Sequence, residues 1–295
     1  MNTPMSFPSD PDWLDREYNN RARVPDSAEF MARWAQDSQA ARERGKAALD
    51  LPYGEGPGET LDVFPATANE GAAAPVLFFI HGGYWRALDK SDHSFLAPAF
   101  QRLGACVVVP NYALCPGNTV PGITLQMVKA LAWTWRHIAA HGGDPQRITV
   151  AGHSAGGQLA AMMLACRWSE VGADLPDALV RNALSLSGLF DLEPLRLAPH
   201  LQSSLRLTPE QVRRASPARL PSPGLRQGRG ALVAVVGGEE SSEYHRQNRL
   251  IQAAWGPEVV PVCEALPGLN HFSVLDALVR PEHRLHALAR SGLAV

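Results

Sequence analysis

A five-residue sequence, Gly152-His153-Ser154-Ala155-Gly156, constrains the fold of this chain more than any other feature. It follows an apolar run that predicts a strand, Ile148 to Ala151, and it precedes a helical pattern, Ala155 to Arg167. Small residues on both sides of the serine let the backbone bend sharply, which would present Ser154 Oγ at the carboxyl end of the strand and the positive end of the helix. An incidental serine in a glycine-rich turn is the alternative, but the strand–turn–helix context favours a reactive serine.

Strand-like and helical patterns alternate along the chain after the first fifty residues. Several strand-like runs are almost continuously apolar, as expected for parallel strands covered on both faces. The alternation predicts an α/β fold with a mostly parallel, doubly wound sheet. We expect strands at Thr60–Phe64, Val76–Ile80, Ala105–Val109, Ile148–Ala151, Ala183–Ser187, Ala231–Val236 and Val259–Ala265, and helices at Ser94–Leu103, Ile123–His141, Ala155–Arg167, Glu243–Trp255 and Phe272–Ala289.

The N-terminal residues differ in character from the rest. The pattern from Asp26 to Leu49 is helical, with Ser27 as the expected N-cap and Trp34 on the apolar face. We therefore expect residues 1–50 to form a helical segment that packs on or caps the site, and residues 51–295 to form the catalytic domain.

A second segment, Pro194 to Gly230, is long and rich in Pro, Ser and Arg. We expect it to hold a short helix from Pro209 to Arg214 and to help roof a site.

Composition excludes several classes of protein. Of the 295 residues, 45% are hydrophobic and 19% are charged, which excludes a disordered or fibrous chain. The 27 Lys and Arg residues against 29 Asp and Glu residues give a formal net charge of -2. Because nucleic acids and anionic membranes attract basic faces, neither is expected as a partner. No apolar stretch approaches the roughly 20 residues of a membrane-spanning helix.

The cysteines and the N-terminus suggest where the protein resides. Four cysteines are scattered without a CxxC pair, which predicts reduced thiols in a cytoplasmic protein. The stretch from Met1 to Asp12 lacks the basic and then apolar pattern of a secretory signal. The expected partner is a small-molecule substrate, and the sequence leaves a homodimer open.

A serine hydroxyl is a weak nucleophile that needs a base, which a carboxylate in turn orients. His271 is the histidine that lies in a loop after the last predicted strand and before the last predicted helix. A histidine exposed on the surface is the alternative there. His153 lies inside the serine turn and is expected to be structural. His137 and His141 lack the glutamate of an HExxH motif, so we expect neither a metal site nor a cofactor.

Three residues are candidates for the carboxylate. Glu239 and Glu240 follow the predicted strand that ends at Val236, which is where the chain order Ser, acid, His requires the acid. Asp191 follows an earlier strand, so we expect it to shape the pocket floor or cap a turn. These residues alone do not decide between the two glutamates.

A glycine-rich sequence, His81-Gly82-Gly83-Tyr84-Trp85, ends another predicted strand. Acyl transfer builds negative charge on the carbonyl oxygen of the substrate, and backbone N–H groups of such a loop can stabilise it. We expect the N–H groups of Gly83, Tyr84 and Ala155 to form this oxyanion hole. A plain turn at the strand end is the alternative.

Together these motifs resemble the serine-dependent kynurenine formamidases (arylformamidases), a branch of the α/β-hydrolases close to the hormone-sensitive-lipase-like esterases. The resemblance extends from about Tyr53 to the end of the chain. It rests on HGGYW, GHSAGG, Asn111-Tyr112-Ala113-Leu114-Cys115-Pro116, Ser187-Gly188-Leu189-Phe190-Asp191-Leu192, the Glu240–Gln247 stretch and Asn270-His271-Phe272.

The resemblance implies an α/β-hydrolase fold and a Ser-His-acid triad. The family usually has aspartate in a D-S-x-E-F sequence, and matching Glu240-Ser241-Ser242-Glu243-Tyr244 to it places the acid at Glu240. The expected triad is then Ser154, Glu240 and His271, with glutamate in place of aspartate.

The expected function is hydrolysis of a small carboxylic ester or an aryl formamide, such as N-formylkynurenine, through an acyl-enzyme intermediate. Tyr84 and Trp85, with Trp13, Phe30 or Trp34, are expected to line an apolar pocket, although each aromatic residue could instead belong to the core. The alternatives are a thioesterase, a peptidase-like hydrolase or a non-catalytic binding protein of the same fold.

Overall fold

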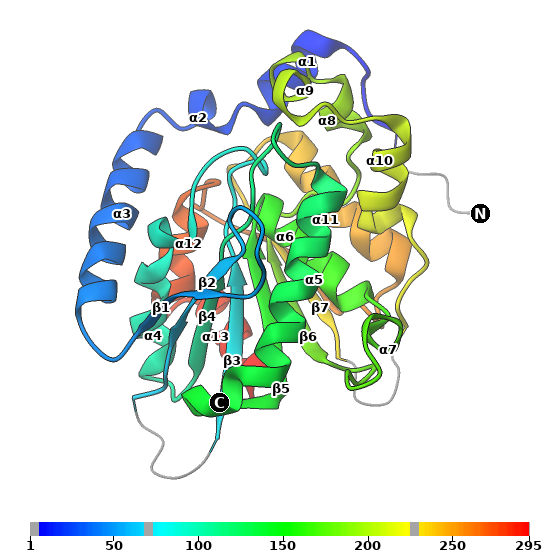
Figure 1. The fold of residues 1–295 in the computed structure, drawn as a ribbon. Coiled ribbons are helices and arrows are strands. Elements are labelled where there is room, and N and C mark those ends of the chain that lie inside the picture. The colour runs from blue at the N-terminus through cyan, green and yellow to red at the C-terminus, as the bar shows by residue number, and fades with distance from the viewer. Residues whose placement is uncertain (1–5, 68–72, 225–229, 295) are drawn as a thin grey trace.

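One eight-stranded sheet crosses the centre of the molecule (Figure 1). The computed structural model describes residues 6–67, 73–224 and 230–294. The strands are β1 (Ala48–Pro52), β2 (Thr60–Phe64), β3 (Ala74–Ile80), β4 (Cys106–Pro110), β5 (Gly143–His153), β6 (Val180–Leu186), β7 (Leu232–Gly237) and β8 (Val262–Leu266). Their order is β1-β2-β4-β3-β5-β6-β7-β8. Strand β2 is antiparallel to both neighbours and the other pairs are parallel, so the predicted mostly parallel sheet is confirmed.

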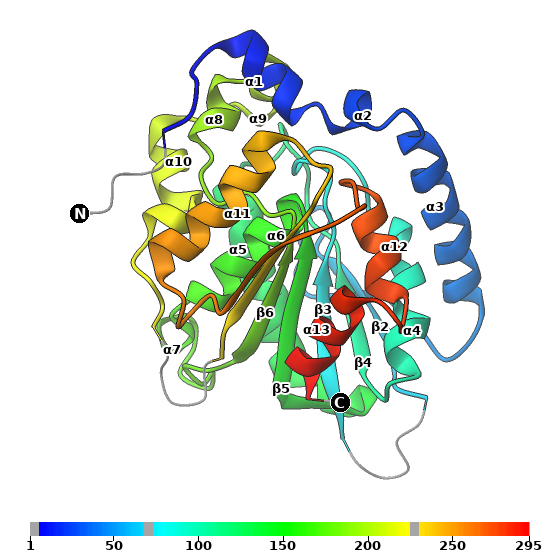
Figure 2. The same cartoon turned by 180° about the vertical axis from the view of Figure 1, so that it is seen from behind.

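Helices cover both faces of this sheet, as Figures 1 and 2 show from opposite sides. Within the described residues, no helix is long and apolar enough to cross a membrane. The α-helices are α1 (Pro11–Tyr18), α2 (Asn20–Arg23), α3 (Ser27–Glu43), α4 (Ala97–Gln101), α5 (Val120–His137), α6 (Ala155–Ala165), α7 (Trp168–Val171), α8 (Glu193–Leu197), α9 (Pro199–Leu205), α10 (Pro209–Ala215), α11 (Ser242–Trp255), α12 (Ser273–Val279) and α13 (Arg284–Leu293). Short 3-10 helices are η1 (Lys90–Asp92), η2 (Ser94–Leu96), η3 (Ile138–His141) and η4 (Pro217–Arg219).

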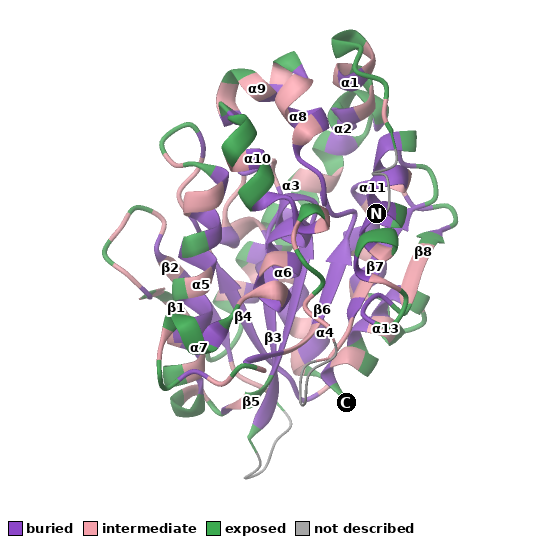
Figure 3. Ribbon diagram, turned by 90° about the vertical axis from the view of Figure 1, so that its right-hand side faces the viewer, coloured by how far each residue is buried: buried purple, intermediate pink, exposed green. Residues whose placement is uncertain are grey.

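Strand β3 explains why the sheet needs helices on both faces. All seven of its residues are buried (Figure 3), and successive residues of a strand point to opposite faces of the sheet. Val76, Phe78 and Ile80 belong to the apolar core beneath α5 and α6, whereas Leu77 and Phe79 belong to the core beneath α4, α12 and α13. The continuous apolar runs in the sequence therefore mark strands buried on both sides, as predicted.

Three predictions about the elements are wrong. The helix expected from Asp26 to Leu49 ends at Glu43, and the chain then forms the edge strand β1; Asp26, not Ser27, is the N-cap. A local helical pattern could not reveal this strand, because its pairing with β2 is a tertiary contact. The helix expected from Phe272 to Ala289 is split into α12 and α13, because Arg280 precedes a proline and adopts an extended conformation.

A buried cluster of charges fixes the end of α3 to the sheet. The carboxylate of Asp62 in β2 is fully buried and accepts hydrogen bonds from Arg42 of α3 and from Lys90 Nζ, the latter at 2.7 Å. Lys90 Nζ also lies 2.6 Å from Asp50 Oδ1. Residue 50, where we placed the domain boundary, therefore lies within β1 and inside this cluster, and the two-part division stays a prediction.

Two segments lie across the carboxyl edge of the sheet. In Figure 1, α1 and α2 cross the top of the molecule beside α8 and α9, and α3 runs down one side. The predicted helix near Pro209 is confirmed as α10, whereas α8 and α9 were not predicted. Residues 225–229 of the Pro194–Gly230 segment lie outside the described residues.

Candidate active site

Ser154 occupies a sharp turn between β5 and α6. Its φ is 56° and its ψ is -116°, a backbone conformation that residues other than glycine rarely adopt. The Ser154 N–H donates to Leu186 O of β6 at 2.8 Å. A Cβ atom on Gly156 would lie 2.0 Å from Ile80 O, so only glycine lets α6 approach β3 this closely. The predicted strand–turn–helix geometry is thus present, with Ser154 at the carboxyl end of β5.

His271 lies in the loop between β8 and α12. Its Nδ1 atom is 2.6 Å from Glu240 Oε2, and both residues are buried. Because the carboxylate accepts this hydrogen bond, Nδ1 carries the proton and Nε2 is the basic nitrogen. The His271 ring lies 4.7 Å from each of the rings of His153 and Tyr244, which restrict its orientation.

The structure separates the three acid candidates. Glu240 is buried, and its other carboxylate oxygen, Oε1, accepts hydrogen bonds from the Ser187 hydroxyl and from the Gly237 N–H. Glu239 is exposed to solvent. Asp191 pairs with Arg219 Nε at 2.9 Å and caps the Glu193 N–H, which is the turn-capping role expected for it. Of these candidates, Glu240 alone contacts His271.

His153 connects the serine turn to the histidine loop. Its Nε2 donates to the main-chain oxygen of His271 at 2.8 Å. Burial, followed by the nearby His271 and His93, holds the pKa of His153 well below its ordinary value. A neutral ring with Nε2 protonated fits this hydrogen bond, so His153 holds the main chain of the His271 loop against the serine turn.

The loop after β3 contains three consecutive residues with positive φ: 101° at Gly83, 50° at Tyr84 and 55° at Trp85. A Cβ atom on Gly83 would lie 2.1 Å from Ala87 O, so this turn requires glycine there. No main-chain acceptor is found for the N–H groups of Gly83, Tyr84 and Ala155 within the described residues. Positive φ values gather neighbouring N–H groups into a concave, anion-attracting arrangement.

A buried polar network lies beneath this loop. The Tyr112 hydroxyl is 3.0 Å from His81 O and 3.1 Å from Gly82 O, and it shares its proton between the two carbonyls. His81 Nε2 lies 3.2 Å from Asn111 Oδ1. Burial lowers the pKa of His81, so the ring stays neutral and the network holds the loop without adding charge.

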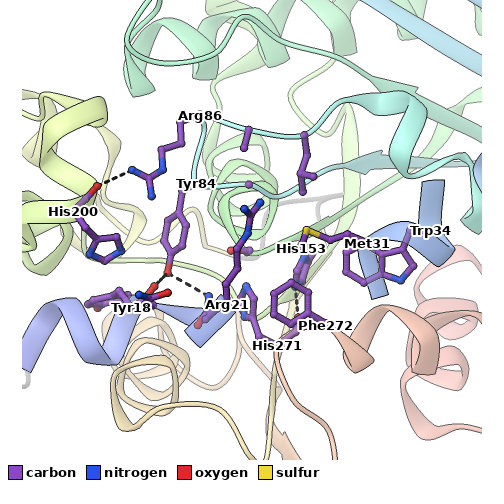
Figure 4. Close-up of a pocket in the computed structure, with 16 residues that line it drawn as sticks. Tyr18, Arg21, Met31, Trp34, Tyr84, Arg86, His153, His200, His271 and Phe272 are labelled. Atoms are coloured by element: carbon purple, nitrogen blue, oxygen red, sulfur yellow. Dashed lines mark hydrogen bonds between the residues drawn. The ribbon is translucent and has the colours of Figure 1, made fainter. Parts of the chain in front are cut away.

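A pocket of about 240 Å³ opens onto Ser154 and His271 (Figure 4). Tyr84 and Trp34 line it, as expected, and so does Met31. Trp85 does not: its side chain is fully buried and its Nε1 donates to Gln158 Oε1 at 3.2 Å. Trp13 and Phe30 are not among the lining residues either. The pocket residues are Tyr18, Asn19, Asn20, Arg21, Met31, Trp34, Gly83, Tyr84, Arg86, Ala87, Leu88, His153, Ser154, His200, His271 and Phe272.

Tyrosine hydroxyls connect the N-terminal segment to the loop after β3 and to α11. The Tyr84 hydroxyl donates to Tyr18 O at 2.7 Å, so the 2.6 Å hydrogen bond between Tyr84 and Tyr244 takes its proton from Tyr244. The Tyr244 oxygen accepts from Asn20 Nδ2 at 2.8 Å. Burial raises the pKa of Tyr244. The N-terminal segment therefore reaches Tyr244, whose ring lies 4.7 Å from that of His271.

Sequence reasoning missed several residues around the pocket. Arg86 follows HGGYW directly and could have been noticed for its position. Asn20 and Arg21 belong to a polar stretch before Pro25 that carries no recognisable motif. Ser187 was noted only as the first residue of a family motif, without a role, and nothing in the sequence pattern pointed to His200. The described residues contain no group of three or more His, Cys, Asp or Glu side chains that could hold a metal ion.

The sheet order, the helices on both faces and the serine turn after β5 define the α/β-hydrolase fold. A protein family with the description "alpha/beta hydrolase fold" matches residues 77–223 of this chain. The chain belongs to this alpha/beta hydrolase family. It is a hydrolase of the esterase-like and kynurenine-formamidase-like kind, as the sequence motifs predicted.

Three relatives illustrate the similarity. A kynurenine formamidase of Salmo salar is 30% identical over 85% of this chain and 83% of its own length. A probable carboxylic ester hydrolase of Mycobacterium tuberculosis, LipM, is 35% identical over 51% of this chain and 36% of its own. The crystal structure of a putative thioesterase from Silicibacter sp. is 33% identical, with a TM-score of 0.78 over 93% of this chain and 97% of that chain.

Proposed function

We propose that this protein is a serine hydrolase that cleaves a small carboxylic ester or an aryl formamide. Ser154 is the nucleophile, His271 the general base and Glu240 the carboxylate that orients the imidazole. The observation that carries the proposal is the 2.6 Å hydrogen bond between His271 and Glu240, together with the position of Ser154 and His271 on one pocket. The similarity to esterases and to kynurenine formamidases supports the same reaction class.

The first half of the reaction forms an acyl-enzyme. His271 Nε2 removes the proton from Ser154 Oγ as the oxygen attacks the substrate carbonyl, and Glu240 stabilises the imidazolium that results. The N–H groups of Gly83, Tyr84 and Ala155 stabilise the negative charge on the carbonyl oxygen. Their lack of main-chain acceptors supports this role, since such groups are available to a ligand.

The imidazolium gives its proton to the leaving alcohol or amine as the C–O or C–N bond of the substrate breaks, which completes the acyl-enzyme. The second half of the reaction releases the acyl or formyl group. His271 removes a proton from the water that attacks the acyl carbonyl, and it returns this proton to Ser154 Oγ as the acyl–oxygen bond breaks, which frees the carboxylic acid and the serine. No cofactor takes part in these steps.

Residues 1–50 contribute to the pocket in this proposal. Tyr18, Asn20 and Trp34 line it from the N-terminal segment, and they help to exclude water from the acyl-enzyme. The volume of about 240 Å³ lies just below the roughly 300–1,000 Å³ common for ligand pockets. A small substrate fits such a pocket better than a long-chain lipid or a folded peptide.

A substrate series tests the proposal. The purified protein is assayed on p-nitrophenyl esters of increasing acyl length and on N-formylkynurenine, with Ser154→Ala as the matched background. Short esters or the formamide should give the highest kcat/KM, and Ser154→Ala should abolish turnover of each. Turnover that is unchanged in Ser154→Ala would refute the mechanism, and a preference for long acyl chains would refute the substrate size.

Thioester hydrolysis is the second candidate. The 33% identical structure named a putative thioesterase is the observation that favours it. Phenyl acetate and S-phenyl thioacetate form a matched pair that differs in the scissile atom. For each substrate, kcat/KM is divided by the rate of uncatalysed hydrolysis. This ratio should be much higher for the thioester if the protein is a thioesterase, and much higher for the ester if it is an esterase.

A further inference from the structure

The charge distribution around the pocket is strongly one-sided. Among the described residues that line it are two arginines, Arg21 and Arg86, and no aspartate or glutamate. Two carboxylates of α1 have partners other than these arginines: Asp15 pairs with His200 at 2.6 Å and Glu17 pairs with Arg23 at 3.3 Å. Positive charge on Arg21 and Arg86 is therefore not neutralised by an ion pair within the described residues. A small ester or formamide without charge needs neither arginine.

Arg86 is held in a fixed position. Its Nη1 atom donates two hydrogen bonds, to His200 O at 2.7 Å and to Ser204 Oγ at 2.7 Å, and both acceptors belong to α9. These two bonds use both hydrogens of Nη1. Within the described residues no acceptor is found for Nε or Nη2, which form the edge of a guanidinium that binds a carboxylate with two parallel hydrogen bonds.

Arg86 also belongs to the loop that carries the proposed oxyanion hole. It follows Trp85, and its N–H donates to Gly83 O at 3.0 Å, so the proposed oxyanion loop itself carries the arginine. Arg21 comes from α2 on the opposite side of the pocket, and Figure 4 shows its side chain between those of Tyr84 and His153. Arg21 is exposed and has no hydrogen-bond acceptor for its guanidinium in the described residues.

We propose that Arg86, with Arg21, forms a carboxylate-binding subsite, and that the preferred substrate is a small ester or formamide that carries a carboxylate. The proposal rests on the serine hydrolase function and names the substrate class of that same pocket. Arg86 supplies a preorganised two-pronged contact, and Arg21 adds positive charge from the N-terminal segment. Met31, Trp34 and Phe272 on the other side of the pocket would contact the apolar part of the substrate.

Paired substrates of nearly equal shape test the subsite. One pair, 4-acetoxybenzoate and its methyl ester, places the charge on the leaving group. The other pair, mono(4-nitrophenyl) succinate and 4-nitrophenyl butyrate, places it on the acyl group. The wild-type protein should prefer the anionic member of at least one pair. The pair with the larger preference shows on which side of the scissile bond the carboxylate lies.

Arg86→Gln should lower this preference, measured as the ratio of the two kcat/KM values, by about 10- to 100-fold, because a hydrogen-bonded charge contact is lost. Arg21→Gln should lower the ratio less, since the side chain is exposed. Arg44→Gln, an exposed arginine at the end of α3, is the control and should leave the ratio unchanged. Equal losses on both members of each pair, or no preference in the wild type, would overturn the subsite.

A binding measurement separates this proposal from the hydrolase function. Benzoate and benzamide are titrated into the wild-type protein and Arg86→Gln by calorimetry, without any turnover. Tighter binding of benzoate that disappears in Arg86→Gln supports the subsite, even if Ser154→Ala were to show that the mechanism is wrong. Equal affinity for benzoate and benzamide in the wild type would overturn the subsite, even if the serine chemistry is correct.

Discussion

The floor and the roof of the pocket are built in different ways. The floor consists of loops at the carboxyl edge of the sheet, after β3, β5, β7 and β8, and these loops carry the proposed catalytic groups. The roof consists of α1 to α3, which are distant in sequence and contact the floor through side-chain hydrogen bonds such as Asn20 to Tyr244. Backbone conformations that require glycine or positive φ fix the floor, whereas side-chain contacts, both polar and apolar, position the roof.

This difference predicts two kinds of variant. Changes in the floor should act on the chemical step and lower kcat with any substrate. Changes in the roof should act on substrate binding and raise KM in a manner that depends on the substrate.

The largest effect is expected in the floor, from Glu240→Gln. An amide cannot hold the Nδ1 proton of His271 as the carboxylate does, and a triad with the wrong tautomer loses about 10⁴-fold in kcat. Glu239→Gln, at the exposed neighbouring position, is the control and should remain near wild-type activity. The measurement is kcat on p-nitrophenyl acetate, with circular dichroism to check the fold. If Glu239→Gln or Asp191→Asn were the severe variant instead, the choice of acid would be wrong.

Next in size is a dependence of stability on pH at the junction of roof and floor. His93 is fully buried near Trp34 of the roof and His81 of the floor, and burial lowers its pKa to about 3. The unfolded chain takes up a proton below pH 6.5, but native His93 does not until about pH 3, so stability is lost as pH falls through this window. At pH 5 the loss from this one group is about 2 kcal/mol, or roughly 30-fold in the folding equilibrium.

His93→Phe keeps an aromatic ring at this position and removes the titrating group. Urea unfolding at pH 7 and pH 5 should show a smaller decrease in the free energy of unfolding for the variant than for the wild type. His81 and His153 also have lowered pKa values and leave a residual decrease in both proteins. If the free energy of unfolding decreased equally in the variant and the wild type between pH 7 and pH 5, His93 would be protonated in the native state.

The third effect, about tenfold, is expected where roof and floor meet at Tyr244. Tyr244→Phe keeps the ring that packs on His271 and removes the hydroxyl that bonds to Tyr84 and Asn20. Loss of one such hydrogen bond near the nucleophile should lower kcat by about 10-fold. Tyr53→Phe, which removes a buried hydroxyl that donates to Asn111 O, is the matched control and should not change kcat. Equal effects of the two variants would point to a loss of stability alone.

The smallest effect is expected in the roof, from Met31→Ala. Met31 lines the pocket but contacts none of the proposed catalytic groups by a hydrogen bond, so KM for an aromatic ester should rise about 3- to 10-fold, in proportion to the apolar area lost. KM for a short acetyl ester should change less, and kcat should change for neither. Leu125→Ala, an exposed apolar residue on α5, serves as the control. Equal changes for both substrates would remove the distinction between roof and floor.

The same difference explains what could be predicted from the sequence. The floor was predictable because its geometry needs particular residues at short spacing: glycines around Ser154, two glycines after His81, and a histidine after the last strand. The choice of Glu240 over Glu239 needed the family resemblance, because adjacent residues look alike until burial separates them.

The roof could not be predicted at the same level. Several of its contacts join residues more than 60 positions apart, such as Tyr18 with Tyr84, and a single sequence without tertiary contacts gives no signal for them. Edge strand β1 was missed for the same reason, since its partner β2 defines it. Trp85 was expected in the pocket because aromatic residues suit aromatic substrates, yet its side chain fills the core behind the loop.

The central claim is that Ser154 is the nucleophile, and the most direct measurement is the site of covalent labelling by a fluorophosphonate. The probe reacts only with a serine that a base activates, and peptide mass mapping of the labelled protein identifies the residue without reference to any substrate. We predict stoichiometric labelling at Ser154, no labelling of Ser154→Ala, and loss of hydrolysis in proportion to the label. Labelling at another serine, such as Ser187 or Ser241, or full activity in a protein labelled at Ser154, would contradict the account.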